Sequence, residues 1–158
     1  MDVNILNQFI LATDKIFQQL GDFGLQKLGL ERLADSSKIQ AKVATILGLT
    51  GSIKGQLVFT MEEPLAMKLA SSILMGAPVN KYNEVAESGF CETVNMVAGE
   101  AARRLGELGF QCELSVPSIL RGNSIEIGFQ PPVPIFLVRF TTKYGPVQML
   151  LALQTPRR

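Results

Sequence analysis

Apolar residues recur at helical spacing along one stretch in the middle of the chain, residues 87–109. Positions three or four apart in this stretch are apolar, as in an amphipathic helix that buries one face. These positions are Phe90, Val94, Val97, Ala101, Leu105 and Leu108. The pattern therefore predicts a long helix whose apolar stripe faces a core.

The opposite face of this predicted helix is polar. Its residues stand about one turn apart and are Ser88, Glu92, Asn95, Gly99 and Arg103. At this spacing the Glu92 carboxylate and the Asn95 carboxamide point the same way, above a glycine that has no side chain to block approach. A solvated helix face is the commoner explanation of such a pattern, and a site that a partner can reach is the alternative.

The rest of the pattern alternates helices with pairs of strands. Capping residues mark the ends of the first helix, with Asp2 before it and Gly21 after it. Runs rich in β-forming residues on either side of turn residues mark the hairpins. The predicted elements, in chain order, are a helix over 4–20, an extended segment over 23–37, a hairpin over 39–61, a helix over 62–76, the long helix, extended segments over 112–116 and 119–129, a loop over 130–134 and a hairpin over 135–154.

The order of these elements repeats along the chain. Helix, strand region, hairpin and helix are followed by helix, strand region and hairpin, and two such halves predict an α+β fold, a mostly antiparallel sheet with the long helices packed on one face. We expect a single domain over residues 1–158. The last run, 147–153, is too apolar for an exposed edge strand. It is therefore either central or covered by another subunit, and a homodimer is expected.

Composition narrows the choice of partners and compartment. Lys and Arg number 15 against 14 Asp and Glu, so we expect neither nucleic acid nor a membrane as a partner. No apolar run approaches the ~20 residues that span a bilayer, and the N-terminus lacks the pattern of a signal peptide. The two cysteines, Cys91 and Cys112, are expected to be plain thiols, which suits a cytoplasmic protein.

Absent residue types limit the chemistry. The chain contains no histidine, which excludes Ser-His-Asp and Cys-His catalysis and removes the commonest metal ligand. Gly48, Gly51 and Gly55 match no phosphate-binding loop and are typical of a turn between strands. We therefore expect no cofactor and no metal site on this chain.

Four segments of the chain resemble a known family. They are MDVNILNQFILAT, ILGLTGSIKGQLVFT, ETVNMVAGEAARRLGELGF and LSVPSILRG. Together they are similar to the CheX-type chemotaxis phosphatases, relatives of the CheC and FliY proteins, and the resemblance runs over nearly the whole chain. The motif of that family is a Ser or Asp, then a Glu and Asn pair on a long helix, then a later proline. It falls here on Ser88, Glu92, Asn95 and Pro117.

The resemblance implies a phosphatase that removes the phosphoryl group from the aspartyl phosphate of a CheY-like response regulator. It implies that Glu92 pairs with the active-site lysine of the regulator and that Asn95 orients the attacking water. The regulator would supply the acid pocket and Mg²⁺, and this chain only the helix. Such positioning suits an acyl phosphate, which is already activated, and a neutral carboxamide adds no repulsion among carboxylates and phosphate.

Some positions depart from the family pattern or leave a role open. The first helix carries Asn4 and Asn7 without a glutamate partner, so we expect one site per chain. Cys91 and Glu100 replace a glycine and an asparagine that are usual in the family, which can change partner preference. Ser88 is either a peripheral contact or, as we favour, an ordinary early-helix residue.

A second class of function stays open. A non-catalytic adaptor or flagellar-switch-like module could dock a response regulator through the same helix, and such a protein could lose Asn95 and keep Glu92. The presence of both residues favours the enzyme. Pro117 is expected to shape a strand end, and Arg103 and Arg104 to be solvated or paired with glutamates rather than to bind phosphate.

Overall fold

Three helices and nine strands form the part of the chain that the computed structural model describes, residues 2–33, 36–122, 124–128 and 133–155. The helices are α1 (Val3–Leu20), α2 (Glu63–Ile73) and α3 (Glu84–Glu107). The strands are β1 (Gln26–Leu33), β2 (Ser36–Ile39), β3 (Val43–Gly51), β4 (Lys54–Met61), β5 (Cys112–Leu114), β6 (Ser118–Arg121), β7 (Ile125–Gly128), β8 (Ile135–Thr142) and β9 (Gly145–Gln154). Most of the loop predicted over 130–134 lies outside the described residues.

The main sheet is antiparallel and has seven strands in the order β1-β8-β9-β4-β3-β5, with β6 also paired to β3. The hairpins β3–β4 and β8–β9 meet at its centre, where β4 pairs with β9. Each hairpin is extended by a strand from the other half of the chain, β1 beside β8 and β6 beside β3. The predicted α+β fold with its antiparallel sheet is confirmed, and the two halves exchange outer strands.

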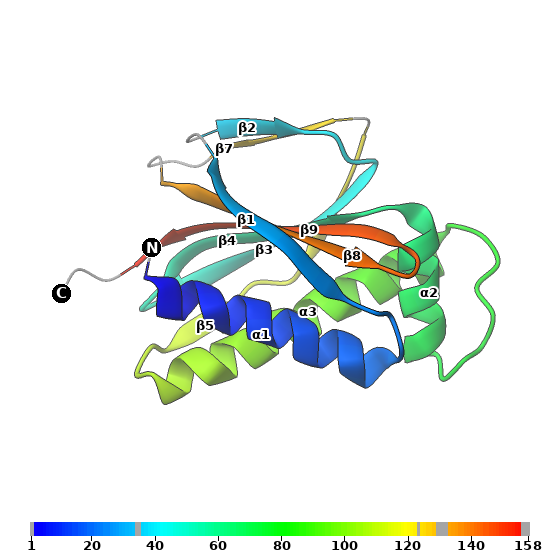
Figure 1. Ribbon diagram of the computed structural model, residues 1–158, viewed down its shortest axis with the longest axis horizontal. Helices are drawn as coiled ribbons and strands as arrows, with labels where there is room; N and C mark the ends of the chain where they lie inside the picture. The colour runs from blue at the N-terminus through cyan, green and yellow to red at the C-terminus, as the bar shows by residue number, and fades with distance from the viewer. Residues whose placement is uncertain (1, 34–35, 123, 129–132, 156–158) are drawn as a thin grey trace.

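The sheet separates two layers of different kind. The long helices α1 and α3 cover one face, and the two-stranded sheet of β2 and β7 lies over the other (Figure 1). The larger apolar core, which includes Phe9, Phe90 and Leu151, lies on the helix side. A smaller cluster around Val58 and Leu150 occupies the opposite face. Among the described residues, no helix combines the length and the apolar character needed to cross a membrane.

Two predicted strand assignments are settled by this topology. β9 is central, so its apolar side chains are covered on both faces within one chain, and the sequence alternative of cover by another subunit is not needed to explain them. The first hairpin begins at Val43 rather than at Ile39. Ile39 belongs to β2, because the chain bends between residues 40 and 42 before it enters the main sheet.

The helix α3 buries the predicted stripe, with one exception. The residues buried from it include Phe90, Val94, Val97, Ala101 and Leu105. The prediction was wrong for Leu108, which is 49% exposed. The helix ends at Glu107, and the chain reverses at Gly109 with φ of 92°. At the other end α3 begins earlier than predicted, because the Asn83 carboxamide oxygen accepts the Val85 N–H at 3.0 Å and caps it.

Gly89 brings α3 into close contact with α2. A Cβ atom at this position would lie 2.5 Å from both the Cα and the Cβ of Ala70. Real Cβ atoms do not approach other carbons so closely, so the two helix backbones can meet here only across a glycine. This contact fixes how α3 is rotated, and with it which residues face outward.

A buried carboxylate ties the start of α3 to β6. Glu87 Oε2 accepts the Tyr82 hydroxyl at 2.9 Å and Arg121 Nε at 2.6 Å. A second Arg121 nitrogen contacts Glu87 Oε1. The Arg121 guanidinium thereby holds the pKa of Glu87 below its usual range.

A second carboxylate ties α3 to α1. Glu100 Oε1 accepts Lys15 Nζ of α1 at 3.1 Å, and Arg103 and Arg104 of its own helix at 2.8 Å and 3.1 Å. Hydrogen bonds from Arg103 are the main cause that lowers the pKa of Glu100 to about 2. The predicted pairing of both arginines with glutamate is confirmed.

Replacing Gly89 by Ala should destabilise the fold, because the added methyl group collides with α2. We expect the free energy of unfolding to fall by roughly 1–3 kcal/mol, the usual cost of overpacking. Gly99 of the same helix has no atom within 4 Å of its would-be Cβ. Gly99→Ala is therefore the matched control and should gain about 0.5–1 kcal/mol from helix propensity. Urea unfolding measures both, and equal effects of the two changes would contradict the α2–α3 contact.

Replacing Glu100 by Gln should reduce stability in a pH-dependent way. The carboxylate has a lowered pKa in the folded state, so its contribution is present above its ordinary pKa of 4.5 and is lost as the pH falls toward about 2. Because its cationic partners are a quarter to a half exposed, we expect a loss on the order of 1 kcal/mol near neutral pH. The free energies of unfolding of the wild-type protein and of Glu100→Gln, measured across this pH range, should converge at its acid end. Glu107→Gln, which removes only an exposed pair with Arg103, should change stability less.

Candidate functional site

Glu92 and Asn95 lie side by side on the outer face of α3, as the sequence predicts. Both residues are exposed, whereas Phe90, Thr93 and Val94 around them are buried. Residues three apart in a helix have their Cβ atoms about 5–6 Å from one another. Burial of the inner face of α3 therefore presents a carboxylate and a carboxamide to solvent together.

An open hollow of about 470 Å³ lies between α3 and the segment that follows β5. One wall belongs to the helix, and the other is the end of β5 with the next three residues. The helix wall consists of Ser88, Cys91, Glu92 and Asn95, and the opposite wall of Leu114, Ser115, Val116 and Pro117. All four motif residues picked out from the sequence therefore line one hollow, although Pro117 lies between β5 and β6 rather than on α3.

Ser88 and Pro117 occupy positions at the two sides of this hollow. Asn83 rather than Ser88 caps the helix, and Ser88 is an exposed residue of the second helical turn, where a peripheral contact would lie. Pro117 stands between the end of β5 and the start of β6, where it separates two strands that both pair with β3. Both residues thus shape the rim around Glu92 and Asn95.

Among the described residues, Glu92 and Asn95 lack the partners that hold several charged residues of α3. Glu87, Glu100 and Arg103 are all held in ion pairs. Within the described part of the chain, Glu92 forms no ion pair and the Asn95 carboxamide forms no hydrogen bond. These two groups are therefore free to meet a partner without breaking a contact of the fold.

The thiol of Cys91 lies on the helix wall of the hollow. Burial raises the pKa of the Cys91 thiol and, in the same way, that of Cys112. Both cysteines are free, as predicted. A thiol with a raised pKa is a weaker nucleophile near neutral pH. Cys91 adds bulk to the helix wall of the hollow.

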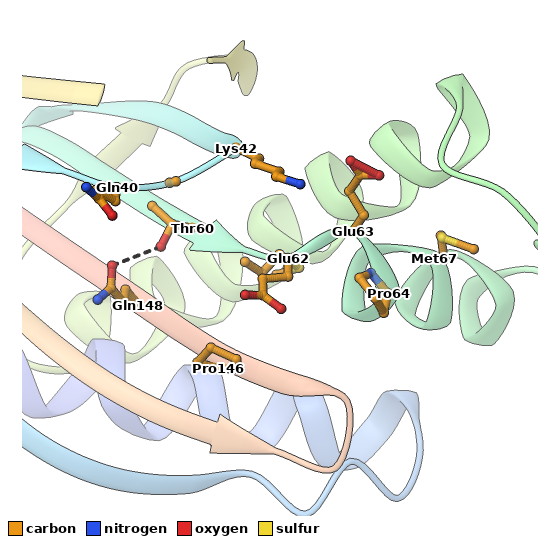
Figure 2. A pocket seen from close by; sticks show the side chains of 11 residues that line it. Gln40, Lys42, Thr60, Glu62, Glu63, Pro64, Met67, Pro146 and Gln148 are labelled. Carbon is orange, nitrogen blue, oxygen red and sulfur yellow. Dashed lines mark hydrogen bonds between the residues drawn. The ribbon is translucent and has the colours of Figure 1, made fainter. Parts of the chain in front are cut away.

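A larger hollow of about 690 Å³ lies away from these residues. Figure 2 shows Thr60 and Gln148 joined by a hydrogen bond in it, with Glu62, Glu63 and Pro64 at the start of α2. None of the motif residues lines it, so it does not belong to the predicted site. Among the described residues, no group of three or more Cys, Asp or Glu side chains is arranged to hold a metal ion.

Sequence reasoning missed most of the second wall, Leu114, Ser115 and Val116. The local pattern there shows only a strand that ends before a proline. The wall is placed by Ser115, whose hydroxyl accepts the backbone N–H of Gly48 at 2.7 Å, a residue far away in the chain. Pro117 could have indicated this wall. The family motif places Pro117 near Glu92 and Asn95, so the residues next to it in the chain must lie near that pair as well.

Comparison of the amino-acid sequence with those of known proteins identifies a family and a relative. The family model for the chemotaxis phosphatase CheX matches residues 43–141, more than half of the chain. The CheY-P phosphatase CheX of Thermotoga maritima is 29% identical over 129 residues, which cover 80% of this chain and 81% of that protein.

Solved structures share the fold. The CheC-like superfamily protein from Shewanella sp. PV-4 matches with a TM-score of 0.84 at 21% identity, over 98% of this chain and 99% of that one. The CheX–CheY–BeF3–Mg²⁺ complex from Borrelia burgdorferi matches with a TM-score of 0.68 at 16% identity, over 97% of this chain and 99% of the matching chain. The fold and the match to the family model agree, and the chain belongs to the CheX family of chemotaxis phosphatases.

Proposed function

We propose that this protein hydrolyses the aspartyl phosphate of a CheY-like response regulator. The observation that carries the proposal is the convergence of Ser88, Glu92, Asn95 and Pro117 on one open hollow, with the Glu92 and Asn95 side chains lacking polar partners in the described chain. A relative is named CheY-P phosphatase, and a protein of the same fold has been solved in complex with CheY, BeF3 and Mg²⁺. Both names support this substrate class.

The proposed reaction needs positioning more than it needs acid or base groups. An aspartyl phosphate is a mixed anhydride: water attacks phosphorus, the bond from phosphorus to the aspartate oxygen breaks, and inorganic phosphate and a free carboxylate result. The water must be held in line with the leaving oxygen. A carboxamide can accept a hydrogen bond from this water through its oxygen and donate one through its nitrogen, so Asn95 is the proposed orienting residue.

Glu92 is the proposed docking residue. Its exposed carboxylate stands one turn from Asn95, so a lysine that pairs with Glu92 would bring the neighbouring phosphoryl group within reach of the Asn95 carboxamide. In this proposal the regulator brings the Mg²⁺, no cofactor binds this chain, and the reaction takes place in the cytoplasm. The charge of Glu92 guides the partner, while the neutral Asn95 enters a pocket rich in negative charge without repulsion.

Replacing Asn95 by Ala should abolish most of the acceleration and leave binding intact. We expect the rate of phosphate loss from a phosphorylated CheY-type regulator with Mg²⁺ to fall by a factor of about 10² or more, as for other removed positioning groups. Asn7→Ala is the matched control, since Asn7 is an exposed asparagine of α1, and it should be fully active. Full activity of Asn95→Ala would place the chemistry elsewhere.

Replacing Glu92 by Gln should weaken docking. We expect the regulator concentration at half-maximal rate to rise about tenfold, because one charge pair is lost. Binding is measured separately by titration with CheY in the BeF3 and Mg²⁺ state. If the wild-type protein binds a regulator through this helix but accelerates nothing, it is an adaptor and the phosphatase proposal is wrong.

We further propose that the protein forms a homodimer. β1 is an edge of the main sheet, paired only with β8 among the described strands, and it exposes Leu28 and Leu30. A strand edge with exposed apolar side chains can pair with a second copy. Sedimentation equilibrium at micromolar concentration should give twice the mass of one chain. Replacing Leu28 by Lys should shift the measured mass toward that of a single chain. A wild-type mass of a single chain would contradict the dimer.

A further inference from the structure

The two walls of the hollow beside Glu92 and Asn95 differ in character. The α3 wall carries most of the polar groups, whereas the opposite wall consists of Leu114, Val116 and Pro117 together with Ser115. Val116 is 85% exposed. Single exposed apolar residues are common on proteins and need no explanation by themselves. What sets Val116 apart is how its backbone is held.

Ser115 fixes the chain immediately before Val116. Its backbone N–H donates to the carbonyl oxygen of Gly48 in β3 at 2.9 Å, and its hydroxyl accepts the Gly48 N–H at 2.7 Å. The same hydroxyl lies 3.4 Å from the carbonyl oxygen of Val116, to which it donates. Ser115 therefore links the backbone of Gly48 in β3 to the backbone of the exposed Val116.

Two further features hold the segment in the same place. Pro117 follows Val116 directly, which restricts Val116 to extended conformations. Gly48 allows the close approach from the other side, since a Cβ there would lie 3.3 Å from Ser115 Oγ. Val116 is thus presented to solvent by a backbone that is already ordered. An apolar group presented in this way loses little conformational entropy when a partner covers it.

We propose that Val116 is an apolar docking contact for the response regulator and that Ser115 is the positioning residue that presents it. The inference rests on the proposed function, because Val116 lines the same hollow as Glu92 and Asn95. A partner that reaches the Asn95 carboxamide must sit over this hollow and therefore covers Val116. The surface of the regulator that fits this hollow has charged groups around its phosphorylation site and an apolar rim beside them.

Replacing Val116 by Ser should weaken docking without slowing the chemical step. We expect KM for the phosphorylated regulator to rise about tenfold while kcat stays within about twofold, because burial of a valine contributes to binding in the ground state and transition state alike. Val85→Ser is the matched control, an exposed valine of α3 that does not line the hollow. It should leave both constants unchanged.

The role of Ser115 is tested by a pair of variants. Ser115→Ala removes the hydroxyl that links Gly48 to Val116, so KM should rise as in Val116→Ser, and combining the two changes should add little. Ser115→Thr keeps the hydroxyl and should restore a KM near that of the wild-type protein. Circular dichroism melts verify that each variant is folded. A rise in KM with Thr as large as with Ala would show that the hydroxyl does not position the loop.

The outcome separates this docking contact from the phosphatase activity. Titration with CheY in the BeF3 and Mg²⁺ state, in an Asn95→Ala background, measures docking without turnover. If Val116→Ser weakens binding there while the wild type accelerates nothing, the docking surface stands and the phosphatase proposal fails. If the wild type is active and Val116→Ser binds like Val85→Ser, Val116 is no contact and the inference is overturned. If the wild type binds no CheY-type regulator, both are overturned.

Discussion

The packing of α3 against α2 and the sheet is the constraint on which the site depends. Side chains on a helix point in fixed directions, so the burial of one face decides which residues face outward. The apolar stripe sets this rotation broadly, and the contact of Gly89 with Ala70 sets it closely, because the two backbones meet where no side chain intervenes. Glu92 and Asn95 owe their outward direction to residues that take no part in chemistry.

Charge on α3 is divided between holding the fold and meeting a partner. Glu87 connects the start of the helix to β6, and Glu100 connects its later turns to α1. Both are largely shielded from solvent, where an unpaired carboxylate would be costly. Glu92 stands in water, where lack of a partner costs little. The same residue type thus serves two purposes on one helix, and burial decides which.

Much of this arrangement follows from local pattern. The periodicity of the apolar residues predicted α3 and its outward pair, and capping residues such as Asp2 and Gly21 predicted the ends of α1. Leu108 was misplaced because it continues the apolar spacing beyond the residue at which the helix stops. Periodicity describes faces, and it does not say where the hydrogen bonding of a helix ends.

The second wall of the hollow could not be predicted in this way. Ser115 acquires its role from Gly48, and no local pattern records which backbone a serine hydroxyl will meet. The position of β9 also depends on contacts that are distant in the sequence. Its apolar run allowed either a central strand or a covered edge, and only its pairing with β4 and β8 decides between the two. Only the resemblance supplied Pro117, the one motif residue beyond the long helix.

The central place of β9 also dictates the order in which the molecule can be completed. β9 is the last of the described strands, yet β4 and β8 both pair with it, and β1 can pair only once β8 is present. A chain emerging from the ribosome has made all of α3 before the middle of its sheet exists, and until then β4 has an unpaired edge. The sheet can therefore be completed only after β9 has been made, and its folding is dominated by contacts between residues distant in the sequence. A nascent or truncated chain without β9 would expose the unpaired edges of β4 and β8, which can associate with other chains.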